Sequence, residues 1–140
     1  MAISKRETIL ARISQSLAGT RLVGSRIYRS RHEPLARGEL PALVIEPVND
    51  QSNLQTLGVI EWTFQARIVT LIAGLVPDQL ADVILQDIHS KIMTDSTLDG
   101  LVINIEPSAV AFDIIEGDQP RGAISTTFTI TYRTARESII

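Results

Sequence analysis

The chain of 140 residues has no cysteine, and only 4% of its residues are aromatic. The absence of cysteine excludes disulfides, cysteine-ligated zinc or iron–sulfur centres and thiol catalysis. Because aromatic residues are so few, the core has to be built from isoleucine, leucine and valine. A chain of this length buries roughly two-thirds of its unfolded surface, so an aliphatic core suffices for folding. We expect one domain, residues 1–140.

Long apolar segments are also missing. The polar N-terminal residues 1–5 lack the apolar stretch of a signal peptide. The longest uncharged apolar run, 68–77, is about half of the ~20 residues that a membrane-spanning helix needs. We therefore expect no membrane partner and synthesis in the cytoplasm.

Motifs that carry chemistry are equally scarce. The two histidines, His32 and His89, lack a second ligand at the spacing of a metal site. The glycines are scattered and form no phosphate-binding loop or nucleophile elbow. The sequence thus predicts no catalytic, metal-binding or cofactor-binding residues, and no enzyme activity.

Two segments have the periodicity of amphipathic helices. Residues 4–18 begin with a capping box, Ser4 to Glu7, and are followed by Gly19 as a C-terminal stop. Residues 77–93 begin with Pro77, which suits a first helical turn. The apolar face expected for this second helix consists of Leu80, Ala81, Ile84, Leu85, Ile88 and Ile92.

Strand patterns account for most of the remaining chain. We expect strands at about 26–29, 42–46, 58–73, 101–106, 109–115 and 123–134. In 58–73 and 123–134, apolar residues alternate with threonine, glutamine and arginine, so one face is predicted to be buried and the other wet. The polar segments 49–56 and 117–122 are predicted to be loops.

These elements predict an α+β fold, a mostly antiparallel or mixed sheet with two helices packed on one face. The polar face of the sheet has no remaining element to cover it. That face and the sheet edges are therefore expected to be available to a partner chain.

The net charge of −3 is unevenly distributed along the chain. Residues 1–38 carry a net charge of +6, and residues 39–140 carry −9. Neither a helix-turn-helix nor an RNA-binding aromatic motif accompanies the basic segment, so nucleic-acid binding is not favoured. A solvated basic loop is one alternative. The asymmetry fits better with a basic surface that meets an acidic surface of the neighbouring subunit, because such head-to-tail contacts close rings.

The segment 27–45, which contains Arg-Gly-Glu-Leu-Pro-Ala, lies between a helix ending near Gly19 and a second helix leading to Asp99-Gly100. This layout resembles the tail terminator proteins of long-tailed bacteriophages, the group of the lambda-like minor tail protein U. The resemblance implies a homohexameric ring at the head-proximal end of the tail tube in the virion. Such a ring ends tube polymerisation and joins the head, without catalysis or a cofactor.

The partners implied are the tail tube protein and the head–tail connector, with duplex DNA only passing through the ring lumen. For the subunit interface we expect Arg29, Arg31, Arg37 and Glu39. For docking to the tube, the two polar loops offer Asp50, Asn53, Gln55, Asp118, Gln119 and Arg121. The alternatives are another small head–tail completion protein, or a non-viral α+β binding module with a ligand site on the sheet.

Overall fold

The computed structural model describes residues 2–30, 37–115 and 120–140. In chain order the elements are α1 (Lys5–Leu17), β1 (Ile27–Arg29), the 3₁₀ helix η1 (Arg37–Glu39), β2 (Ala42–Thr56), β3 (Val59–Ala73), α2 (Pro77–Thr94), β4 (Asn104–Ile115) and β5 (Arg121–Ala135).

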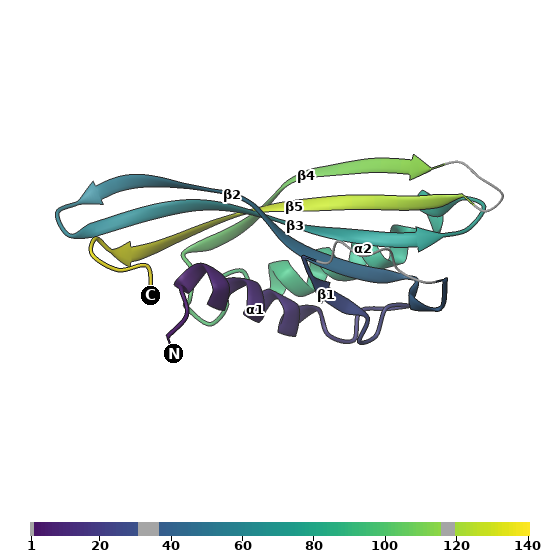
Figure 1. The fold of residues 1–140 in the computed structure, drawn as a ribbon, viewed down its shortest axis with the longest axis horizontal. Helices are drawn as coiled ribbons and strands as arrows, with labels where there is room; N and C mark the ends of the chain where they lie inside the picture. Colours follow the sequence, from purple (N-terminus) through teal and green to yellow (C-terminus); the bar gives the residue numbers. More distant parts are fainter. Residues whose placement is uncertain (1, 31–36, 116–119) are drawn as a thin grey trace.

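The strands form one five-stranded sheet in the order β1-β2-β3-β5-β4. β1 is parallel to β2, and all other neighbours are antiparallel. Figure 1 shows α1 and α2 on the same side of this sheet. The predicted fold class, a mixed and mostly antiparallel sheet with two helices on one face, is thus confirmed.

Both helices begin where the sequence predicts. Ser4 caps α1 by accepting a hydrogen bond from the Glu7 backbone N–H, and Pro77 occupies the first turn of α2. Apolar residues at helical spacing are buried against the sheet: Ile9, Leu10, Ile13 and Leu17 in α1, and Ala81, Ile84, Ile88 and Ile92 in α2. Leu80, predicted to lie on the buried face of α2, is exposed instead.

The core lies between the helices and the long central strands. β3 and β5 pair over their full lengths, and their apolar positions face the helices. Phe64, Phe128 and Tyr132 are its largest buried side chains, and aliphatic residues surround them. Near β1, Val44 and Val69 are also buried on the opposite face, as the apolar pattern there indicates.

The prediction of a loop at 49–56 is wrong. These residues continue β2, pair with β3 as far as Thr56, and leave only Leu57 and Gly58 as the turn. Gly58 has a φ of 87°, a conformation that glycine adopts without strain. The polar composition of 49–56 suggested a loop, but backbone pairing with the strongly patterned β3 imposes a strand on it.

The two strands expected at 101–106 and 109–115 form one strand, β4, that begins at Asn104. Pro107 and Ser108, which suggested a break, lie at a register shift in this strand. β4 is an edge strand, so the missing N–H of Pro107 costs little there. The sheet therefore has five strands rather than six.

Candidate assembly surfaces

The predicted interface residues are partly engaged within the subunit. The Arg29 guanidinium contacts the Glu7 carboxylate at 2.8 Å, and this contact lowers the pKa of Glu7 below its usual value. Glu39 accepts a hydrogen bond from the Tyr28 hydroxyl at 3.3 Å. Arg31 and the Arg37 side chain lie outside the described residues. Their contact with a neighbouring subunit stays a prediction.

The charge asymmetry along the sequence is largely compensated inside the fold. Arg6 pairs with Asp50 at 2.7 Å, and Arg12 contacts both Asp95 and Asp99. Arg21 donates its backbone N–H to Asp87, which lowers the pKa of that carboxyl group, and its guanidinium lies 3.4 Å away. Arg6, Arg12 and Arg21 therefore bind carboxylates of their own subunit. The expected contact between a basic surface and an acidic surface of the neighbouring subunit stays a prediction.

The predicted tube-docking residues do not form two loops. Asp50, Asn53 and Gln55 lie in β2, and Arg121 begins β5. Asn53 is exposed opposite Glu61 on the helix-free face of the sheet, whereas the Asp50 side chain points toward the helices and is only 8% exposed. The side chain of Gln55, and Asp118 and Gln119 altogether, lie outside the described residues.

Asp50 is the centre of a buried polar cluster that sequence reasoning missed. Its Oδ2 accepts hydrogen bonds from Arg6 Nε in α1 and from the Tyr132 hydroxyl in β5, while its buried Oδ1 has no hydrogen-bond partner among the described residues. Burial, followed by the contact with Asp50, raises the pKa of Tyr132 above its usual value. Trp62 stacks on Tyr132, and the Arg6 guanidinium lies 5.9 Å from the Trp62 ring centre.

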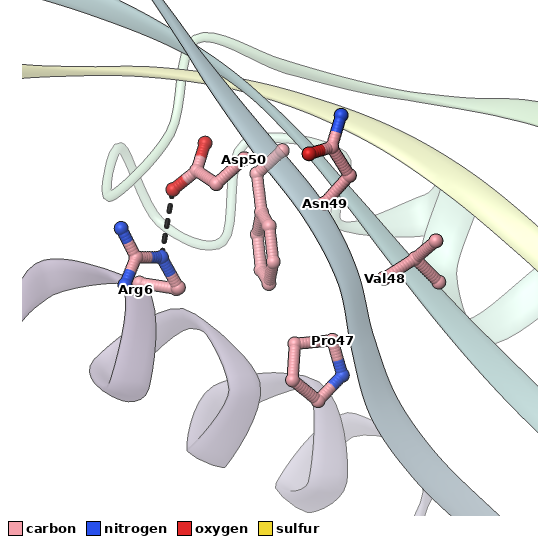
Figure 2. Close-up of a pocket in the computed structure, with 6 residues that line it drawn as sticks. Arg6, Pro47, Val48, Asn49 and Asp50 are labelled. Atoms are coloured by element: carbon pink, nitrogen blue, oxygen red, sulfur yellow. Dashed lines mark hydrogen bonds and ion pairs between the residues drawn. The ribbon is translucent and has the colours of Figure 1, made fainter.

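Next to this cluster is a pocket of about 380 Å³. Figure 2 shows Arg6 reaching from α1 to Asp50 beside the strand that forms one wall. The lining residues are Arg6, Pro47, Val48, Asn49, Asp50 and Phe64. β1 pairs with β2 only as far as Ile45, so the pocket adjoins the part of β2 that lies beyond β1. Its lining combines apolar side chains with an ion pair.

The helix-free face of the sheet is polar, as predicted. Thr127, Thr129 and Thr131 follow one another on this face of β5. On the neighbouring strands, Arg67 pairs with Glu46 at 2.9 Å and Arg133 pairs with Glu61 at 3.2 Å. Neither α1 nor α2 lies over these side chains (Figure 1).

The edge strand β4, on the side of the sheet away from β1, exposes apolar side chains. Val110, Phe112 and Ile114 of β4 are 49%, 58% and 44% exposed. They pair with Thr126, Ile124 and Gly122, so they stand on the same side of the sheet as the helices but are not fully covered. The sequence Val-Ala-Phe-Asp-Ile at 110–114 indicates that these three large apolar side chains share one face of the strand. It does not show whether that face is covered by the rest of the subunit.

Comparison of the sequence with models of known protein families gives no match, and comparison with curated proteins gives none. Among the described residues, no group of three or more histidine, aspartate or glutamate side chains is placed to hold a metal ion. None of the described helices is long and apolar enough to cross a membrane.

Proposed function

We propose that the protein is a phage tail terminator, a structural protein whose copies form a hexameric ring at the head-proximal end of the tail tube. The ring ends polymerisation of the tube and provides the surface that joins the head. The observation that supports assembly is the exposed apolar edge strand β4. The resemblance around residues 27–45 suggests the position in the virion.

An edge like β4 is unusual for a protein that works alone. It is 12 residues long, and Val110, Phe112 and Ile114 remain about half exposed. Soluble proteins normally protect such edges with charges, bulges or covering elements, because an open strand recruits other chains. β4 has a bulge near Pro107, but its apolar half has none, and the one charge there, Asp113, points to the helix-free face, away from Phe112 and Ile114. A partner chain is the simplest cover for this half.

The tip of the β2–β3 hairpin is the element that we assign to the tail tube. The hairpin projects beyond α1 (Figure 1), and Leu57 in its turn is 93% exposed. A rigid pair of strands holds this leucine away from the rest of the subunit. The docking role predicted for a polar loop at 49–56 therefore passes to the turn at 57–58.

The experiment that tests the ring is particle mass in solution, combined with negative-stain imaging of the purified protein. A hexamer with a central channel wide enough for duplex DNA supports the proposal. A monomer at high concentration contradicts it.

Docking to the tube is tested by the variant Leu57→Ser, which should assemble normally but fail to stop tube growth, giving overlong tails. Leu75→Ser is the matched control, because Leu75 is also a highly exposed leucine in a connecting segment. Tails of normal length from Leu57→Ser contradict the assignment of the hairpin tip.

The predicted charge contact between subunits has its own test. Reversing Arg31 and Arg37 together, Arg31→Glu with Arg37→Glu, should give smaller species by light scattering if these side chains bind acidic groups of the neighbour. An unchanged hexamer removes them from the interface.

The pocket beside Asp50 favours a second candidate, a small binding module. Its lining of Phe64, Pro47 and the Arg6–Asp50 pair is the usual mixture of an apolar wall and a few polar groups. A monomer that binds a small molecule there would favour this function over a ring. Another head–tail completion protein would instead form a ring without stopping tube growth.

A further inference from the structure

We infer that neighbouring copies join edge to edge, with strand β4 of one subunit lying along residues 47–56 of β2 in the next, and with Phe112 entering the pocket beside Phe64. This inference rests on the proposed ring, because it specifies how its subunits meet. It requires two complementary edges on one chain.

The sheet has these two edges. On one side, β1 pairs with β2 only at 43–45, so within the described residues no strand pairs with the outer edge of 47–56. On the other side, β4 is the outermost strand along its whole length. Because the two edges are different surfaces, a contact between them is head-to-tail and repeats from subunit to subunit.

The side chains on the two edges are complementary in shape and polarity. Val110, Phe112 and Ile114 project on the helix side of the sheet, and the pocket opens beside β2 on that same side. In a sheet that continues across the subunit boundary, the faces align, so these apolar side chains would meet Pro47 and Phe64 on the helix side of the sheet. Phe112 is the largest and most exposed of the three, and we place it in the pocket.

Strand direction and stagger are compatible with closure. β2 and β4 run in opposite directions within a subunit, so copies related by rotation about an axis along the strands pair them antiparallel. The strand registers give the height of each edge along the sheet. The middle of β4 pairs with β5 residues that in turn pair with residues 67–68 of β3, whereas the middle of 47–56 pairs with residues 62–63 of β3. The two edges are therefore offset along the strand direction by about five residues, or ~17 Å. Across the strands, one subunit contributes four strands, which span ~19 Å. A strand tilt of about 40° absorbs such an offset, which is within the range of closed sheets.

The absence of cysteine makes this contact directly testable by cross-linking. The variant with both Pro47→Cys and Phe112→Cys places one thiol at the pocket and one on β4, both at exposed positions on the helix side of the sheet. After mild oxidation, a non-reducing gel should show a ladder of covalent multiples that ends at the size of the ring. The single variants Pro47→Cys and Phe112→Cys should stay monomeric on the gel.

A decoy pair fixes the face of the strand. Ala111 is exposed next to Phe112 but points to the helix-free face, so Pro47→Cys with Ala111→Cys should cross-link at most one-tenth as much. An intact ring without a ladder from the Pro47–Phe112 pair overturns the inference and leaves the proposed function standing. Covalent dimers from Phe112→Cys alone show that β4 pairs with itself, which also overturns it. A monomer before oxidation contradicts both the inference and the ring.

Discussion

The two outer strands of the sheet, β2 and β4, are held in opposite ways. Beyond β1, β2 is polar, and Asp50 fastens it to Arg6 of α1 and to Tyr132 of β5. β4 is apolar, and Val110, Phe112 and Ile114 have little cover within the subunit. β2 is thus secured by groups of its own chain, whereas the described residues leave the apolar half of β4 with little cover.

The largest effect on stability is expected at Asp50. In Asp50→Ala, Arg6 loses its partner and the Tyr132 hydroxyl is left buried without an acceptor. Removing one member of a buried ion pair costs about 3–5 kcal/mol. Because Arg6 is 34% exposed, we expect a loss of about 2–3 kcal/mol, measured by urea unfolding.

The control for this prediction is Asp113→Ala on the other outer strand. Asp113 is exposed and has no ion pair or hydrogen bond in the described chain, so its removal should change stability by less than ~0.5 kcal/mol. Equal losses in the two variants would mean that the Asp50 cluster does not secure β2, and the comparison between the strands would fail.

The second effect falls on association rather than on folding. Burying a phenylalanine in an interface contributes about 2 kcal/mol, so Phe112→Ser should weaken each subunit contact roughly 30-fold. Sedimentation at several concentrations should show the ring dissociating at higher concentration than in the wild type. Unfolding of the monomer should be nearly unchanged, because Phe112 is 58% exposed in the subunit.

The variant Leu22→Ser supplies the comparison, since Leu22 is an apolar residue of equal exposure far from β4 in the sequence. It should associate like the wild type. If both variants associate normally, the exposed stripe on β4 is not an interface.

Parts of the fold whose pattern is local could be predicted from the sequence. Apolar and polar residues alternate strongly in β3 and β5 because one face of these strands packs against the helices. The capping residues Ser4 and Glu7 indicate where α1 begins. Residues 49–56 could not be predicted as a strand, because their pairing depends on β3 and not on their own alternation. For the same reason, Pro107 looked like a break until its position on an edge was known.

The candidate surfaces were harder to predict than the fold. Counting charges along the chain suggested a basic surface, but distance in the sequence does not show that Arg12 lies beside Asp95. The polar face of the sheet was predicted because alternation in two strands marks it directly. The stripe on β4 was not, since exposure depends on how far α2 extends over the sheet. Burial of Asp50 likewise requires knowledge of where α1 packs.

The third effect is a loss of stability at alkaline pH, which comes from the contact between Tyr132 and Asp50 of β2. Burial and the Asp50 contact raise the pKa of Tyr132 above 10.0, so the folded state keeps the phenol proton when the unfolded chain releases it. Stability from this group is complete below pH 10 and is lost as the pH rises above that value. Tyr132→Phe should remove this alkaline loss at a cost of about 1 kcal/mol at neutral pH, measured by thermal unfolding across pH 7–11. Equal alkaline slopes in both proteins would contradict the assignment.

The smallest effect concerns Arg29, which the sequence predicts at the subunit interface and the fold pairs with Glu7. Arg29 lowers the pKa of Glu7, so the contact stabilises the subunit above the usual pKa of 4.5, and this contribution is lost as the pH falls through the lowered value. Both groups are partly exposed, so a double-mutant cycle of Arg29→Gln and Glu7→Gln should give a coupling of only ~0.3–0.5 kcal/mol at pH 7, which declines as acid protonates the Glu7 carboxylate. A coupling that appears only in the assembled ring would instead support Arg29 as an interface residue, because its partner would then be the Glu7 carboxylate of the neighbouring subunit.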